Sequence, residues 1–336
     1  MCRVIAAALI FLVLGPAPGT DQRLPKTGTS AQRIVALALD YPAGREGRLR
    51  FVRGWRLQSP NAMFGGFSAL ATIGPERLQF VSDGGYGVRL TLRSDGRVDG
   101  AHIGLLPAPA DTPRRKSQSD FEAMAVDRAS GTTWVALEGR NQIWRIDPAL
   151  THIESRAKLP KPHWPPNRGP EAMVRLPDGR MLVFSEDADD DPRGRAAFLF
   201  RGDPAIPGTR AQPFLYDAEG KGAVSDAAVL PDGRVLIVHR RLGFRPVFTT
   251  ILAIVDPADI RPGGVVRSRA IGQVPAPLAE NYEGAAVEVR DGRTVLWLVS
   301  DDNFNSWQRS LLVEFELVDL PARLPARTAG SKKAAP

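Results

Sequence analysis

Small, apolar and polar residues recur along the chain in a fixed order. Each copy opens with a small or acidic residue, followed by small and apolar residues, and continues for roughly a dozen positions, usually with a turn such as Pro-Asp-Gly. An apolar segment follows and ends in polar or charged side chains, as in Trp134-Val-Ala-Leu-Glu138. The copies begin roughly 50 to 57 residues apart, at Ser68, Glu122, Glu171, Asp226 and Glu283.

This spacing is typical of β-propeller blades, each of which contains about four strands. The sequence therefore predicts an all-β fold with five clear blades, in which the small-residue run is the inner strand of each blade. Apolar segments at 34–39, 49–57 and 311–318 predict further strands near both ends of the chain. We expect these strands to close a sixth blade, which would remove exposed strand edges. The alternative is that the N-terminal segments add strands to the last blade.

The N-terminus has the pattern of an export signal. Arg3 precedes an apolar run over 4–14, and a segment rich in Gly and Pro over 15–19 ends that run. Because the run is too short to span a bilayer comfortably, we assign 1–19 as a signal peptide and expect a periplasmic or secreted protein. An uncleaved anchor is the alternative. We then expect a flexible leader over 20–33, a propeller domain over 34–320 and a disordered tail over 321–336.

The chain has 336 residues and a net charge of +7, from 44 Lys and Arg against 37 Asp and Glu. The basic residues form no stripe with interleaved aromatic residues, which argues against nucleic-acid binding. The single cysteine, Cys2, excludes intrachain disulfides, cysteine-based zinc sites and a cysteine nucleophile. No phosphate-binding loop or dinucleotide fingerprint is present, so we expect no organic cofactor. We also expect a monomer with no stable membrane insertion after signal cleavage.

The acidic residues that open the repeats form the first candidate site. Equivalent positions of a propeller surround one axis, so Glu122, Glu171, Asp226 and Glu283 should converge at one mouth of the central channel. Their mutual repulsion would require a cation, arginine partners or raised pKa values. Carboxylate oxygens suit Ca²⁺ or, as the weaker candidate, Mg²⁺. The alternative is that each carboxylate caps its own blade by accepting backbone N–H bonds.

A second acidic set ends the apolar segments: Asp83, Glu138, Glu186, Asp301 and Asp302. Basic and amide side chains follow or accompany these ends, namely Arg140, Asn141, His239, Arg240 and Asn303. Acids and bases together at strand ends indicate either a surface that anchors a substrate or a solvated rim of ion pairs. His239 is a candidate general acid or base, or else a surface histidine beside two arginines.

The acidic run over 186–191 has the alternating spacing that opens a calcium loop. Pro192 stands where an EF-hand needs Gly, and Phe198 stands where it needs the closing Glu. We therefore reject an EF-hand, and a surface Ca²⁺ site and a solvated acidic loop remain as the two interpretations.

Several of these segments resemble one bacterial family, that named for the esterase-like activity of phytase. The resemblance is carried by Asp120-Phe-Glu122-Ala-Met-Ala-Val-Asp127, Asn167-Arg-Gly169-Pro-Glu171-Ala-Met, Ser225-Asp226-Ala, Asn281-Tyr-Glu283-Gly-Ala and Ser300-Asp301-Asp302-Asn303-Phe304. It covers about residues 50 to 318 and implies an exported β-propeller that hydrolyses phosphate or other esters. The sequence departs from the pattern at His239-Arg240, where the family leads us to expect a Glu-Arg pair.

These observations give two functional hypotheses. The first is an exported hydrolase acting on a small anionic phosphoester or related ester, with a divalent cation in the channel. Its catalytic residues would be Glu122, Glu171, Glu283 and His239, and its metal ligands Asp83, Glu138, Glu186, Asp226 and Asp301. Its substrate contacts would be Arg140, Asn141, Arg168, Arg240 and Asn303. The second hypothesis is a non-catalytic periplasmic propeller that binds a small anion, a glycan or a protein partner.

Overall fold

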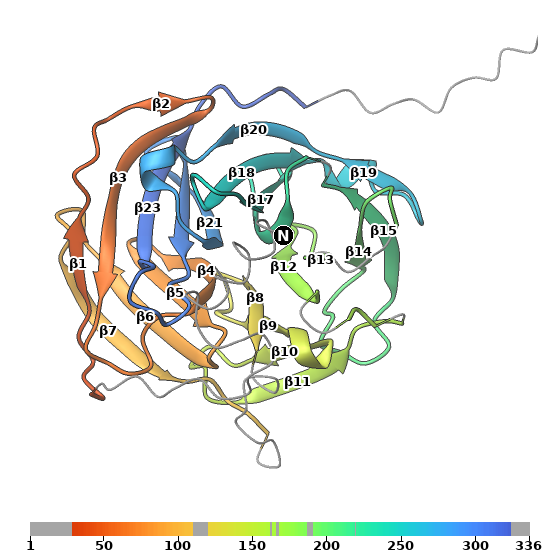
Figure 1. Ribbon diagram of the computed structural model, residues 1–336. Coiled ribbons are helices and arrows are strands. Elements are labelled where there is room, and N and C mark those ends of the chain that lie inside the picture. The colour runs from red at the N-terminus through yellow and green to blue at the C-terminus, as the bar shows by residue number, and fades with distance from the viewer. Residues whose placement is uncertain are drawn as a thin grey trace, which may run out of the picture.

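Each sequence repeat folds into one sheet, and five sheets surround a common axis (Figure 1). The computed structural model describes residues 29–109, 120–161, 163–165, 168–186, 191–218 and 220–323. Strands dominate these residues, and the only helices among them are short 3₁₀ turns such as η2 (Glu138–Arg140), η3 (Pro257–Asp259) and η4 (Ala276–Leu278). The fold is a five-bladed β-propeller, as the repeat predicts.

We number the blades by their inner strands along the chain. Blade 1 contains β4 (Phe67–Gly74), β5 (Arg77–Ser82), β6 (Tyr86–Leu92) and β7 (Val98–Leu105). Blade 2 contains β8 (Phe121–Val126), β9 (Thr133–Leu137), β10 (Gln142–Ile146) and β11 (Ile153–Lys158). Blade 3 contains β12 (Pro170–Arg175), β13 (Met181–Ser185), β14 (Arg195–Phe200), β15 (Ala211–Asp217) and the parallel strand β19 (Val265–Arg267).

Blade 4 contains β16 (Ala223–Val229), β17 (Val235–Leu242), β18 (Phe248–Val255) and β20 (Arg269–Gln273). Blade 5 combines the two ends of the chain. Its inner strands are β21 (Tyr282–Arg290), β22 (Arg293–Ser300) and β23 (Leu311–Leu317), and its outer strands are β3 (Leu49–Gln58), β1 (Val35–Ala38) and β2 (Arg45–Glu46).

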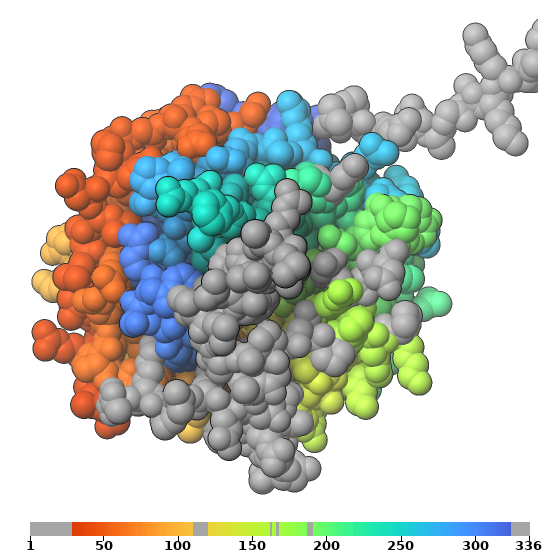
Figure 2. Space-filling view, in the orientation of Figure 1, coloured from red at the N-terminus to blue at the C-terminus, as the bar shows by residue number. Residues whose placement is uncertain are grey.

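The N-terminal strands close the ring inside blade 5. Strand β3 pairs antiparallel with β23, so that Trp55 lies opposite Leu312. Figure 2 shows the red and orange N-terminal strands beside the blue C-terminal ones. The inner strand β21 in turn contacts β4 of blade 1, which completes a circle of five. The expected sixth blade is therefore absent from the described residues, because its strands are used to finish the fifth.

The segment expected to be a flexible leader is partly held by the propeller. Residues 1–28, and with them the predicted signal peptide, lie outside the described residues. Thr29 forms a parallel bridge with Asn61, and the Gln32 side chain bonds both the N–H and the carbonyl of Ile103. Residues 324–336 of the predicted tail also lie outside the described residues. None of the helices in the described ranges has the length and hydropathy needed to cross a bilayer.

Hydrophobic side chains fill the spaces between neighbouring blades. Each of five buried clusters joins two adjacent sheets. Trp55 and Trp297, for example, stack with ring centroids 6.1 Å apart in the cluster shared by blades 5 and 1. Burying one large apolar side chain contributes roughly 1.5–3 kcal/mol, so these clusters fix the blades in place around the axis.

Small residues let the inner strands approach closely at the axis. A Cβ atom at Gly284 of β21 would lie 2.9 Å from the backbone of Ala69 and Leu70 in β4. The corresponding positions in β8 and β12 are Ala123 and Ala172, both fully buried. A larger residue at Gly284 would force blades 5 and 1 apart, at the point where the ring closes.

Every inner strand also carries a β-bulge near its first residue. In β4, Phe67 pairs with Ser82 and Ala69 with Val81, so Ser68 is the extra residue. An extra residue bends the strand and re-aims its side chain. The equivalent bulge residues in blades 2 to 5 are Glu122, Glu171, Ser225 and Glu283.

The bulge in blade 4 falls on Ser225, and this corrects the alignment that placed Asp226 with the other acids. Ser225 donates its hydroxyl to the Tyr282 carbonyl of the next blade, just as Ser68 donates to the Phe121 carbonyl. Asp226 lies one residue further along, with 1 % of its surface exposed. Its carboxylate accepts the N–H of Ala227 at 2.8 Å and the N–H of Ala285 at 2.6 Å. Asp226 therefore joins the inner strands of blades 4 and 5, and burial raises its pKa well above the ordinary value.

We predict that Asp226→Ala lowers the free energy of unfolding by about 2 kcal/mol, because two buried N–H groups lose their acceptor. Asp226→Asn keeps one acceptor oxygen and should cost less than half as much. Urea unfolding of both variants measures this difference. Equal losses in the two variants, or no loss in either, would show that the carboxylate does not hold these strands together.

Candidate functional site

The bulge residues and the acids after the second strands meet at one end of the propeller. Antiparallel pairing brings the start of each inner strand beside the end of its neighbour, as with Phe121 opposite Leu137. Backbone bonds extend this pairing, since the N–H of Glu138 donates to the Asp120 carbonyl and the N–H of Glu186 donates to the Gly169 carbonyl. The two acidic sets predicted separately from the sequence thus form a single cluster at one mouth of the channel.

Two groups of three carboxylates dominate this cluster. Asp83 of blade 1 joins Asp120 and Glu122 of blade 2, and each group of three places its oxygen atoms within 4.8 Å of one another. The second group joins Glu138 of blade 2 to Glu171 and Glu186 of blade 3. Hard cations prefer such all-oxygen ligand sets, so either group could hold a metal ion.

Like charges in a partly buried setting shift the pKa values of these carboxyl groups. Burial raises the pKa of Glu122 well above its ordinary value, and the charges of Asp120 and Glu171 raise it further. Burial also raises the pKa of Glu171, with contributions from Glu186 and other neighbours. The pKa of Asp301 is raised by burial and then by the charge of Glu283. The mouth therefore resists the full ionisation of its own side chains.

Arg240 supplies the compensating charge from blade 4, where the other blades carry an acid after the second strand. Its guanidinium donates to Glu186 at 2.8 Å, to Asn281 at 2.9 Å and to Glu283. Burial alone would lower the pKa of Arg240, but Glu283, Glu186 and Glu171 raise it above the ordinary value. Arg240 thus neutralises the side of the mouth formed by blades 3 and 5.

Hydrogen bonds separate the carboxylates into two classes. Glu138 accepts the Gly169 N–H at 2.9 Å and Asp301 accepts the Asn303 N–H at 2.7 Å, so these two acids fix loops at the mouth. Among the residues that the structure describes, no donor reaches the carboxylates of Glu122 and Glu171. Each of these glutamates belongs to a different group of three, and acidic neighbours raise the pKa of both.

Two glycines make room for the acids. A Cβ atom at Gly169 would lie 2.4 Å from Cγ of Glu138, and one at Gly66 would lie 2.5 Å from Oδ1 of Asp83. Gly66 also has a φ of +63°, a left-handed conformation that favours glycine. Asp302 accepts the Gly66 N–H at 2.9 Å and holds this turn in place.

The remaining predicted contact residues lie at the rim. Arg168 is exposed beside Gly169, and Arg140 lies over the Trp144 ring at 5.9 Å. Asn303 is exposed in the loop after β22. Asn141 instead uses its side-chain oxygen and nitrogen to bond the backbone of Trp164, at 3.0 and 2.8 Å. Asn141 therefore shapes the rim loop and does not face the channel as a free donor.

Sequence reasoning did not select Asp120 or Asn281 for the site. Each stands two residues before a selected acid, and the available signal was its place within the short motif that contains Glu122 or Glu283. Residues 187–190 of the acidic run lie outside the described residues. Its last member, Asp191, pairs with Arg193 at 2.6 Å.

His239 lies away from the carboxylate cluster, between blades 3 and 4. It is fully buried, its Nε2 atom lies 2.7 Å from the Tyr216 hydroxyl, and its ring stacks on the Tyr216 ring with centroids 5.6 Å apart. Successive strand residues point to opposite sides, so Arg240 reaches the mouth and His239 does not. Burial lowers the pKa of His239 to about 4.

A buried neutral histidine makes stability depend on pH. The lowered pKa contributes stability above the unfolded value of about 6.5, and this contribution is lost as the pH falls toward 4. We predict that wild type loses about 2 kcal/mol relative to His239→Gln when the pH falls from 7 to 5. Parallel denaturant titrations at the two pH values measure this difference. A constant difference between the two proteins would contradict the buried neutral state.

Comparisons with known proteins identify a family. Two solved structures that the chain resembles are a glutaminyl cyclase from Myxococcus xanthus and the PQQ-bound aldose sugar dehydrogenase from Streptomyces coelicolor. The cyclase shares 13% identity over 85% of this chain and 99% of its own, with a TM-score of 0.47. The dehydrogenase shares 12% over 86% and 99%, with a TM-score of 0.46. At these values neither bears on function. A comparison with curated proteins finds no match.

The family comparison covers most of the propeller. The model of the phytase-like family, described as esterase-like activity of phytase, matches residues 62–304. This range begins just before β4 of blade 1 and includes every member of both carboxylate groups. The chain therefore belongs to the family described as esterase-like activity of phytase.

Proposed function

We propose that this protein is an exported hydrolase of phosphoesters or related esters that uses a divalent cation, Ca²⁺ in preference to Mg²⁺, at the mouth of its channel. One observation carries this proposal. Glu122 and Glu171 each lie among other carboxylates, and no hydrogen-bond donor of the described residues reaches either of these two side chains. Carboxylates that only capped backbone groups would resemble Asp226, which accepts two N–H bonds. The family supports an ester as the substrate.

The ligand set fits a hard cation. Asp83, Asp120 and Glu122 would hold it on one side, or Glu138, Glu171 and Glu186 on the other. When bound, a divalent cation polarises an ester oxygen and lowers the pKa of its bound water. It would also remove the repulsion that otherwise keeps an anionic substrate away from this mouth.

The side chains around the cation have separable roles in this proposal. With the cation held by one group of carboxylates, the glutamate of the other group, whose pKa burial raises, is the candidate proton acceptor or donor. Arg240 orients Glu186 and Glu283 through its hydrogen bonds. Arg168 at the rim is placed to attract an anionic ester, since guanidinium groups pair well with phosphate oxygens. His239 and Asp226 take no part, because both are committed to contacts between blades.

We predict that Ca²⁺ stabilises the protein and that the effect depends on the glutamates without donors. A Ca²⁺ concentration about 100 times Kd should add about 2.7 kcal/mol of stability, visible as a rise in the thermal unfolding midpoint that chelator reverses. Glu122→Gln and Glu171→Gln should each reduce this rise. Asp226→Asn is the matched control, because it neutralises a buried carboxyl of the same sequence phrase and should leave the rise intact. A rise that survives in both glutamine variants would place the cation elsewhere.

We further predict cation-dependent turnover. Phytate, 4-nitrophenyl phosphate and 4-nitrophenyl acetate should be tested with Ca²⁺ and with chelator, and at least one should be hydrolysed only with the cation. Glu122→Gln should then lower kcat by about 100-fold or more, while Asp226→Asn stays close to wild type. Ca²⁺ binding without turnover of any ester would overturn the enzymatic proposal and favour a propeller that binds a small anion, a glycan or a protein.

A further inference from the structure

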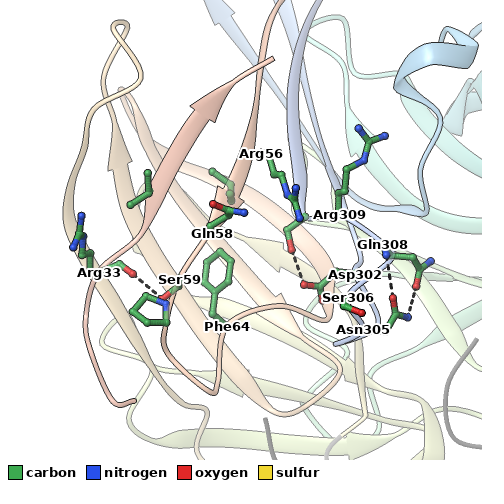
Figure 3. Close-up of a pocket in the computed structure, with 14 residues that line it drawn as sticks. Arg33, Arg56, Gln58, Ser59, Phe64, Asp302, Asn305, Ser306, Gln308 and Arg309 are labelled. Atoms are coloured by element: carbon green, nitrogen blue, oxygen red, sulfur yellow. Dashed lines mark hydrogen bonds between the residues drawn. The ribbon is translucent and has the colours of Figure 1, made fainter. Parts of the chain in front are cut away.

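A second hollow lies outside the carboxylate cluster, where blade 5 meets the N-terminal segment. It has a volume of about 470 Å³ and is lined by the end of β3, by residues 59–64 and by the loop over 302–310 (Figure 3). Cavities of this size commonly hold small organic molecules. Neither the family match nor the proposed hydrolase assigns it a role.

The lining of this pocket combines an apolar wall with cationic side chains. Val35, Leu57, Pro60 and Phe64 supply the apolar surface. Arg33 lies on one side of the pocket and Arg56 and Arg309 on the other, with Gln58 and Phe64 between them (Figure 3). An arginine at each side of an apolar surface suits a ligand with an anionic head and an apolar body.

The arginines differ in how far their charge is compensated. Arg309 donates to Glu280 at 2.5 Å. In the described ranges, the guanidinium groups of Arg33 and Arg56 make neither a hydrogen bond nor an ion pair. The charge of Arg56 acts on Glu280, but that carboxylate is already bonded to Arg309.

The one acid in the lining is turned toward internal donors. Asp302 accepts the N–H groups of Gly66 and Phe304 at 2.9 Å through Oδ1, and the Ser310 hydroxyl at 3.0 Å through Oδ2. These bonds occupy both of its oxygens and leave the pocket with a positive character. The channel mouth a few residues away along the chain has the opposite character, with its clustered carboxylates.

We propose that this pocket is a second binding site that takes a small organic anion, with a carboxylate or phosphate head held by Arg56, an apolar body on Phe64 and Pro60, and the charge of Arg33 attracting the anion from the opposite side. Without a cation in the channel, the carboxylates there repel such a molecule. The anion should then bind at the pocket and not in the channel. This inference does not depend on the hydrolase activity, because binding at the pocket needs neither a metal ion nor turnover.

The test is calorimetric titration of the full chain with phenyl phosphate and with benzoate, in chelator and at low salt. Benzyl alcohol serves as the uncharged control. We expect at least one of the two anions to bind, and the pair together identify the head group that the site prefers. Binding should weaken at least fivefold in Arg56→Gln and in Arg33→Gln, and also on raising the ionic strength. Arg269→Gln, which removes a charge from β20 outside the pocket, should bind like wild type.

Arg33 is exposed, so its replacement should not disturb folding, and unfolding midpoints of all three variants check this. Failure of both anions to bind overturns the proposal. So does binding that survives in both pocket variants, or binding that is lost in Glu122→Gln, since the last result would place the anion in the channel. If Glu122→Gln loses the rise in unfolding midpoint with Ca²⁺ but still binds the anion, the pocket binds independently of the channel. The proposal for the pocket would then stand whether or not the hydrolase proposal does.

Discussion

Repulsion between carboxylates around the propeller axis is the constraint on which the site depends. Two unit charges 4 Å apart interact by about 4 kcal/mol at an effective dielectric constant of 20, and the mouth brings together many such pairs. Arg240 relieves this repulsion on the side of blades 3 and 5, where it binds Glu186 and Glu283. No arginine bond reaches Glu122 or Glu171 among the described residues. The charge of Arg240 still lowers the pKa of Glu171, whereas the charges that act most strongly on Glu122 are all acidic, so Glu122 is the less compensated of the two.

The fold can support such a cluster because its stability comes from elsewhere. Large apolar side chains between neighbouring blades fix the five sheets, and small residues let the inner strands pack tightly at the axis. The bulge that opens each inner strand then turns one side chain toward the mouth. The same bulge carries Ser in blades 1 and 4 and Glu in blades 2, 3 and 5. The repeat thus keeps its geometry while the chemistry varies from blade to blade.

The sequence predicted the propeller, the number of clear repeats and most of the cluster, because blade period and strand-end acids are local signals. It could not predict the register of blade 4, where Ser225 and Asp226 are both compatible with the repeat and only the pairing with β17 shows which is the extra residue. Strand alternation could have separated His239 from Arg240, but the sequence analysis placed both at the site, which is wrong for His239. The sequence also could not show whether the terminal strands form a sixth blade or complete the fifth. That depends on whether five inner strands already close the ring, which is a property of the assembled molecule. The place of Asp120 in the site likewise depends on the assembled sheet, because backbone pairing at the start of β8 brings it to the mouth beside Asp83 and Glu122.

The most direct measurement is a crystal structure of the protein soaked with Mn²⁺, a divalent cation that can be located by its anomalous scattering. If uncompensated carboxylates define the site, an anomalous peak will lie within coordination distance of the Glu122 or the Glu171 carboxylate, together with other members of its group. A peak only at other positions, or none at the mouth while both glutamates make new protein hydrogen bonds, would contradict the idea that these carboxylates are arranged for a cation.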